Sequence, residues 1–179
     1  MSRGVFTAFI AGASLAVLLG TAAWAPADPP SDKVKKFLGG KAVTLLEKAT
    51  KVEVFRIRSE RTGKQGDKYI AGYAITAKGK EQGKELAAKV RKAMFEDKTY
   101  LGQSARCFEP GVALRVWNDK EALEIVICFK CTNFQVTFKG EKDDVEPALF
   151  GFGPGLEPFL ALAKEALPDD AAIQGLKSR

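Results

Sequence analysis

Apolar residues recur along the chain with two different periods, which predict helices in some segments and strands in others. Helical spacing of the apolar residues occurs in three segments: 34–49, 83–95 and 156–167. The first of these contains Gly39 and Gly40, which predict either a kink or two short helices. Ser31 or Asp32 stands where the cap of this segment is expected.

Period-two alternation of apolar and polar residues, together with β-branched and aromatic residues, predicts strands. Such segments are 52–57, 69–76, 112–117, 123–129 and 134–138. The first two are expected to form an antiparallel hairpin around the glycine-bearing loop 61–68. The fourth is apolar on both faces at Ile125, Val126 and Ile127, so we expect it to be a central strand that is covered on both sides.

The order of these elements predicts the fold class. Helix, two strands, helix, three strands and helix favour a single α+β domain over residues 33–170. We expect a mainly antiparallel sheet of about five strands with the helices packed on it. The proline-rich segment 26–32 is expected to be a flexible leader, and residues 171–179 a loose tail.

The first residues carry an export signal. Arg3 precedes the apolar run 5–19, and the small residues around Trp24 form an A-x-A cleavage pattern, which predicts a signal peptide over residues 1–25. The alternative is a retained anchor, but the apolar run is shorter than the ~20 residues that span a bilayer. We expect an exported protein, periplasmic or extracellular, without stable membrane insertion after cleavage.

Charge adds little to this picture. The chain has 28 basic and 22 acidic residues and a formal net charge of +6. An exported basic protein could meet an envelope protein or an anionic envelope polymer, whereas the alternative is a solvated basic surface. No nucleic-acid partner is expected. Five basic residues lie around the first predicted hairpin, where charge commonly protects a sheet edge; they are Arg56, Arg58, Arg61, Lys64 and Lys68.

The chain contains no histidine. Ser-His-Asp triads, H-E-x-x-H zinc sites and histidine acid–base catalysis are therefore excluded. No motif indicates a cofactor. We expect a non-enzymatic binding or structural module.

The three cysteines carry the strongest candidate chemistry. Cys107 stands alone, whereas Cys128 and Cys131 form C-F-K-C, and an exported setting favours a disulfide. A thiol–disulfide oxidoreductase that uses Cys128 and Cys131 is the alternative. The residues after Cys131 alternate like a strand, however, and two residues three apart in a straight strand lie about 10 Å apart. A turn at Phe129-Lys130 would bring the two thiols together.

A metal-thiolate site is a further alternative. Three thiolates fall short of the four ligands that zinc usually takes. Glu109 could be the fourth ligand, but its spacing does not single it out, and we expect no metal. A cysteine nucleophile lacks its usual histidine base.

The expected hairpin of 112–117 with 123–129 suggests which cysteines pair. Extending the register from a two- or three-residue turn puts Cys107 opposite residue 132 or 131. This predicts a Cys107–Cys131 disulfide with Cys128 as a leftover thiol. Because Pro110 and Gly111 disturb a ladder, a Cys107–Cys128 disulfide stays open.

Binding residues are suggested by the same hairpin. Arg115 and Trp117 share a strand face, and with Glu109 they could form the floor of a shallow pocket. Core packing is the alternative role for Trp117.

The stretches C-F-E-P-G-V-A-L-R-V-W and E-I-V-I-C-F-K-C-T-N-F resemble a group of uncharacterised bacterial exported proteins. The resemblance covers mainly the second half of the chain and implies no activity. It implies that nine residues form one constellation around the hairpin: Cys107, Glu109, Pro110, Gly111, Arg115, Trp117, Cys128, Cys131 and Asn133. The candidate binding residues are then Glu109, Arg115, Trp117 and Asn133.

Overall fold

The computed structural model describes residues 28–103, 107–119, 121–140 and 149–177. The predicted signal peptide lies outside these residues. The helices are α1 (Asp32–Leu38), α2 (Gly40–Glu47), α3 (Lys84–Phe95), the 3-10 helix η1 (Asp97–Tyr100), α4 (Leu156–Ala166) and α5 (Ala171–Gln174). The strands are β1 (Lys51–Arg61), β2 (Tyr69–Ile70), β3 (Tyr73–Lys78), β4 (Val112–Asn118), β5 (Glu121–Cys128), β6 (Asn133–Phe138) and β7 (Leu149–Gly151).

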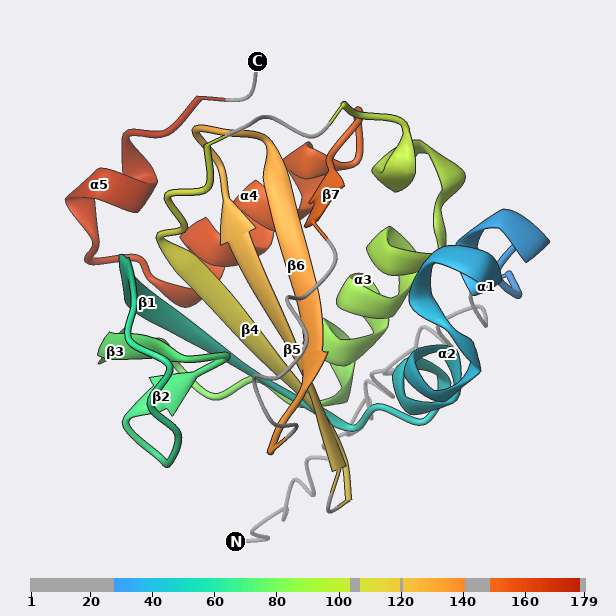
Figure 1. The fold of residues 1–179 in the computed structure, drawn as a ribbon, viewed down its shortest axis with the longest axis horizontal. Coiled ribbons are helices and arrows are strands. Elements are labelled where there is room, and N and C mark those ends of the chain that lie inside the picture. The colour runs from blue at the N-terminus through green and yellow to red at the C-terminus, as the bar shows by residue number, and fades with distance from the viewer. Residues whose placement is uncertain (1–27, 104–106, 120, 141–148, 178–179) are drawn as a thin grey trace, which may run out of the picture.

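The strands form one curled antiparallel sheet in the order β2-β3-β1-β4-β5-β6-β7. Helices α2, α3 and α4 cover one face of it (Figure 1). The predicted α+β domain is therefore confirmed. The sheet has seven strands rather than about five. The two extra strands are β2 and β7, which are too short to show an alternating pattern.

The segment 69–76 is not one strand, because it reverses direction at Ala71 and Gly72. These residues have positive φ values of 47° and 80°. Both lie in the left-handed region that the tightest hairpin turns require. Ala71 is an unusual residue for such a turn, so the sequence did not indicate it.

The helices begin and end largely where the apolar spacing predicts. Gly39 separates α1 from α2, and the side chain of Ser31 accepts a hydrogen bond from the amide of Val34. Residues 171–174, which we expected in a loose tail, form α5. This helix is capped by Asp170, and the side chain of Ile173 is buried.

The β4–β5 hairpin has the register of a two-residue turn. Asn118 pairs with Glu121, and Val112 pairs with Ile127. Leu114 and Ile125 point into the main core with the helices. The other sheet face carries a smaller apolar cluster: Phe55, Ile57, Ile70, Tyr73, Ala113 and Val126.

Candidate functional site

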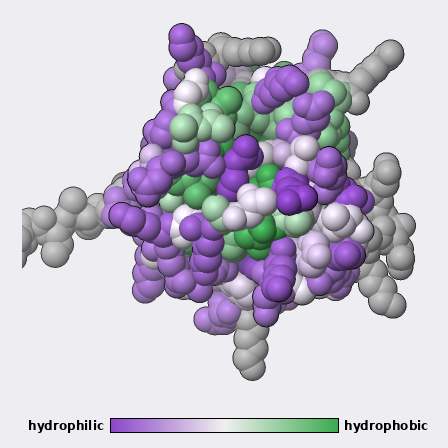
Figure 2. Space-filling model, turned by 90° about the vertical axis from the view of Figure 1, so that its left-hand side faces the viewer, coloured by the Kyte–Doolittle hydropathy of each residue, from purple (hydrophilic) through white to green (hydrophobic). Residues whose placement is uncertain are grey.

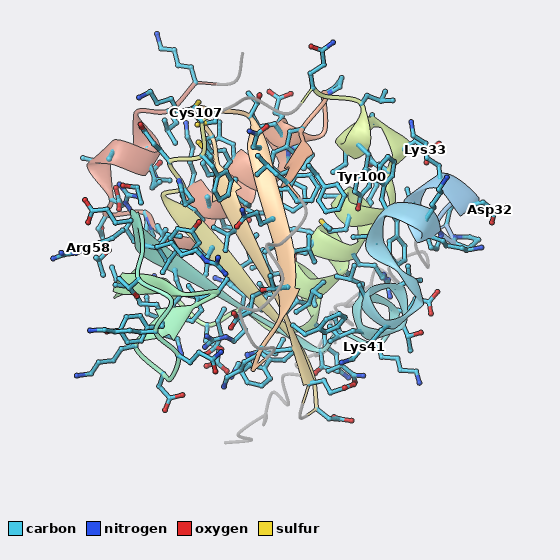
Figure 3. The ribbon with its side chains drawn as sticks, in the orientation of Figure 1. Asp32, Lys33, Lys41, Arg58, Tyr100 and Cys107 are labelled. Atoms are coloured by element: carbon cyan, nitrogen blue, oxygen red, sulfur yellow. The ribbon has the colours of Figure 1, made fainter. Side chains whose placement is uncertain are left out.

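Three cysteines meet at one end of the sheet, where β5 turns into β6. The turn spans residues 129–132, and Thr132 has a φ of 54°. The backbone amide of Cys131 donates a hydrogen bond to the Sγ of Cys128, with a nitrogen–sulfur distance of 3.0 Å. The Sγ atoms of Cys107 and Cys131 lie 3.2 Å apart. Figure 3 shows Cys107 beside the ends of these strands.

The three side chains are free thiols in this structure. The 3.2 Å between Cys107 and Cys131 exceeds the length of a disulfide bond, about 2.05 Å. The two residues are neighbours, although the observed two-residue register of the β4–β5 hairpin points Cys107 to residue 132. The disulfide between Cys107 and Cys131 stays a prediction. The turn that a redox motif needs lies between Cys128 and Cys131.

The thiols differ in exposure and acidity. Cys107 is exposed, Cys131 is 5% exposed and Cys128 is fully buried. The hydrogen bond with Cys131, together with partial desolvation, raises the pKa of Cys107. Desolvation and the contact with Cys128 raise the pKa of Cys131. Reactive cysteines usually have a lowered pKa, so these two thiols lack that activation.

Two polar contacts tie the Cys107 segment to the β5–β6 turn. The side-chain amide of Asn133 donates to the carbonyl of Cys107 over 3.3 Å. Lys130, which lies inside the C-F-K-C motif, forms an ion pair of 3.1 Å with Glu109. Both side chains of this pair are largely exposed, so the pair contributes little by itself. Asn133 and Glu109 thus belong to the cysteine cluster.

Arg115 and Trp117 lie further along β4, on the sheet face opposite the helices. Arg115 stands in a row of polar residues that crosses four neighbouring strands. The row is Glu53, Arg115, Glu124 and Thr137. The candidate binding residues therefore divide into two groups, with Glu109 and Asn133 at the sheet end and Arg115 and Trp117 on the sheet face.

Arg115 is already bound by neighbouring groups. Its Nε donates to Oε1 of Glu124 over 2.8 Å, and its Nη2 donates to the carbonyl of Tyr69 over 2.9 Å. The other carboxylate oxygen of Glu124 accepts from the amide of Ala71 over 2.6 Å. The guanidinium also lies 5.3 Å from the ring centroid of Phe55. Arg115 therefore anchors the β2–β3 turn and is not presented to a ligand.

Trp117 is half-buried outside the helix-covered core. Its Nε1 donates to Glu53 over 2.6 Å, and Lys139 lies 4.7 Å from its ring. Burial by itself would raise the pKa of Glu53, but hydrogen bonds from Lys78 and Trp117 outweigh burial and lower it. Sequence reasoning missed Glu53 and Glu124, although the β4–β5 register alone places Glu124 opposite Arg115.

A groove of about 570 Å³ lies beside the cysteine cluster. Its walls are residues 56–60 of β1, Thr76 of β3 and residues 109–111. Figure 2 views this side of the sheet, where hydrophilic side chains surround smaller apolar areas. Arg56 crosses from β1 to the opposite wall, where its Nη1 donates to the carbonyl of Gly111 over 2.5 Å. The groove therefore combines exposed backbone with charged side chains.

Within residues 28–103, 107–119, 121–140 and 149–177, no three histidine, cysteine, aspartate or glutamate residues are placed to hold a metal ion. None of the helices in these ranges is long and apolar enough to cross a membrane.

Comparison of the chain with models of known protein families, with curated proteins and with solved structures finds no match. The candidate site is therefore interpreted from its own geometry.

Proposed function

We propose that this protein is an exported, non-enzymatic domain that binds an extended segment of a partner protein along the end of β1. The observation that carries the proposal is that Arg58, Ser59 and Glu60 have no ladder partner on the β4 side of β1 among the described residues. On its other side this segment lies along β3, between the pairs Ile57–Ile75 and Arg61–Tyr73, where the register shifts. These three exposed residues line the groove. A strand segment that lacks a neighbour on one side offers the N–H and C=O groups of that side to an incoming chain.

Pairing between β1 and β4 stops because of the residues that precede β4. The last ladder pair is Arg56 with Val112, and the amide of Ile57 still donates to the carbonyl of Gly111 over 3.1 Å. The next residue outward is Pro110, which has no N–H to continue the ladder. The chain thus leaves β1 unpaired on its β4 side at the point where the groove begins.

The opposite wall of the groove is held in place before any ligand arrives. Cys107 and Glu109 connect this wall to the β5–β6 turn, through Cys131 and Lys130. Arg56 joins the wall to β1 and also pairs with Asp170 over 3.2 Å. A preformed groove reduces the entropy lost on binding.

A disulfide between Cys107 and Cys131 would make this wall more rigid. Export to an oxidising compartment, which residues 1–25 suggest, favours its formation. The bond would close the loop between Cys107 and Cys131, and closing a loop of that length would stabilise the fold by about 3 kcal/mol. The raised pKa values of both thiols also support a structural bond over a catalytic one.

The oxidoreductase alternative rests on the contact between the amide of Cys131 and the sulfur of Cys128. In its disfavour, Cys131 is followed by strand β6 and not by a helix whose N-terminus would lower a thiol pKa. Reduction of insulin by the wild type that is lost in Cys128→Ser would favour this alternative over the binding module.

Selected peptides test the proposal directly. Peptides from a displayed random library would be selected on the oxidised protein, and amide chemical shifts would then be recorded on titration. We expect shifts at residues 57–60 and 109–111. In an extended strand Ser59 N–H points to the same side as Ile57 N–H. Ser59→Pro removes this donor and should weaken binding at least tenfold, whereas Ser59→Ala keeps the donor and should bind like the wild type.

A second groove serves as the internal comparison. It lies between α3 and α4, has a volume of about 390 Å³ and is bridged by an ion pair between Lys89 and Glu165. Shifts confined to this groove would contradict the proposal. Equal binding by Ser59→Pro and Ser59→Ala would also contradict it.

A further inference from the structure

The three sulfurs of the cluster are arranged from the surface inward. Cys107 is exposed, Cys131 is 5% exposed, and Cys128 is fully buried. Cys131 is in the middle of this arrangement. Its Sγ lies 3.2 Å from the Sγ of Cys107, and its backbone amide holds the Sγ of Cys128 at 3.0 Å. A reagent in solution can therefore reach Cys107 but not Cys128.

We propose that Cys107, Cys131 and Cys128 form a three-sulfur exchange site, in which Cys131 moves its disulfide between the exposed and the buried partner. With the Cys107–Cys131 bond the free thiol is buried at Cys128. With the Cys128–Cys131 bond the free thiol is exposed at Cys107. The exchange needs no ligand in the groove.

The exchange step is an ordinary thiol–disulfide displacement. The thiolate of Cys128 attacks the Sγ of Cys131, the Cys128–Cys131 bond forms and the Cys107–Cys131 bond breaks. Cys107 leaves as a thiolate and takes up a proton, which balances the proton lost by Cys128. The number of disulfides does not change, so the step requires no oxidant or reductant.

The exchanged form creates a modification site at Cys107. Its exposed thiolate can attack a low-molecular-weight disulfide in solution, which forms a mixed disulfide on Cys107 and releases one thiolate. The Cys107–Cys131 form presents no exposed thiol for this reaction. The position of the internal disulfide therefore decides whether the protein can be modified.

The turn between β5 and β6 makes the second bond feasible. In a straight strand Cys128 and Cys131 would be about 10 Å apart. The four-residue turn instead folds the chain back, so that an atom of Cys131 contacts the sulfur of Cys128. Both alternative disulfides then involve neighbours already in contact.

The test first maps the starting bond. Oxidised wild-type protein is denatured at pH 4 with N-ethylmaleimide, which traps the free thiol without exchange, and its peptides are weighed. We expect a Cys107–Cys131 disulfide and a label on Cys128. A starting map with only the Cys128–Cys131 bond would overturn the proposal, because the Cys107–Cys131 state from which the exchange starts would be absent.

Native labelling then detects the exchange. The folded, oxidised protein is incubated with iodoacetamide at pH 8.5, and samples are mapped over time. We expect label to accumulate on Cys107 together with a new Cys128–Cys131 disulfide. Label on Cys128, or no label on Cys107 by the time denatured protein is fully labelled, would overturn the exchange.

Two variants separate exchange from unfolding. Cys128→Ala removes the attacking thiol, so its Cys107–Cys131 bond should persist and Cys107 should stay at least tenfold less labelled than in the wild type. Cys107→Ala should form the Cys128–Cys131 bond with glutathione disulfide while folded, and failure to do so would contradict the second state. Circular dichroism and melting temperature check folding, and Cys128→Ser replaces Cys128→Ala if that variant does not fold.

Discussion

Arg115 and Glu124 form a buried ion pair on the sheet face that the helices do not cover. Arg115 is 5% exposed and Glu124 is 4% exposed, and both the Nε and the Nη2 of the arginine lie 2.8 Å from one carboxylate oxygen. Arg115 also donates a hydrogen bond to the carbonyl of Tyr69, and Glu124 accepts one from the amide of Ala71, so the pair holds the β2–β3 turn. The pair thus fixes a turn that is distant from it in the sequence.

Removing one partner of this pair should be strongly destabilising. Arg115→Met leaves the carboxylate of Glu124 buried and unpaired, so the free energy of unfolding should fall by about 3–5 kcal/mol. The double variant Arg115→Met/Glu124→Leu buries no charge, so its free energy of unfolding should fall by less than that of Arg115→Met. Urea denaturation measures both. Lys130→Met, which breaks an exposed pair with Glu109, is the matched control and should cost less than about 1 kcal/mol.

Arg115→Met stability within about 1 kcal/mol of the wild type would show that the pair is not the anchor of the β2–β3 turn.

Glu53 should make stability depend on pH in the acid range. Its pKa is lowered in the folded protein, because the hydrogen bonds of Lys78 and Trp117 outweigh burial. Its contribution is therefore present at neutral pH and is lost as the pH falls through the folded pKa. Glu53→Gln should reduce the free energy of unfolding by about 1–3 kcal/mol at pH 7 and by less near pH 3.

Melting temperatures between pH 3 and pH 7, a range that brackets an ordinary glutamate pKa, measure this effect. Glu121→Gln is the control, since Glu121 pairs with Lys41 only at the surface. A constant difference between wild type and Glu53→Gln across this range would contradict the lowered pKa.

In the reduced protein, Cys107 should be alkylated more slowly than an ordinary exposed thiol. Its hydrogen bond with Cys131 raises the pKa of Cys107, so less thiolate is present at pH 8 than for an ordinary thiol. Cys131→Ala removes this hydrogen bond, and the midpoint of the alkylation rate against pH should move to lower pH. Rates would be measured anaerobically in a Cys128→Ala background. Coinciding midpoints in the two proteins would rule out the hydrogen bond as the cause.

Gly155 and Gly111 should tolerate alanine unequally. A Cβ at Gly155 would lie 2.5 Å from the Cα of Thr99, a backbone atom that cannot move aside. A Cβ at Gly111 would lie 2.4 Å from the end of the flexible Arg56 side chain, which can swing away. Gly155→Ala should therefore lower the free energy of unfolding by about 1–3 kcal/mol or more. Gly111→Ala should lower it by about 1 kcal/mol, because the hydrogen bond from Arg56 to the carbonyl of residue 111 is lost.

Gly40 provides the control for these two variants. A Cβ at Gly40 meets no atom within 4 Å, and the residue begins α2. Gly40→Ala should leave stability unchanged or raise it slightly. Denaturant unfolding of the three variants ranks their free energies of unfolding. A larger loss of this free energy in Gly111→Ala than in Gly155→Ala would contradict the prediction.

The sequence alone determined the elements whose cause is local. Apolar spacing located α3 and α4, the glycines at 39 and 40 divided the first helical segment, and Ser31 capped it. The two-residue turn of the β4–β5 hairpin was also among the predicted registers. That register places Arg115 opposite Glu124. Extended outward, it points Cys107 to residue 132, whereas the sulfur that Cys107 contacts belongs to Cys131, inside the β5–β6 turn.

Only the tertiary structure decided the features that depend on contacts between distant segments. Strand β7 is three residues long and exists because it pairs with β6, and β1 lies beside β4 although α3 separates them in sequence. The groove forms where that pairing stops at Pro110. Local patterns record the conformation of a segment, whereas the choice of neighbours is made by the free energy of packing the whole chain.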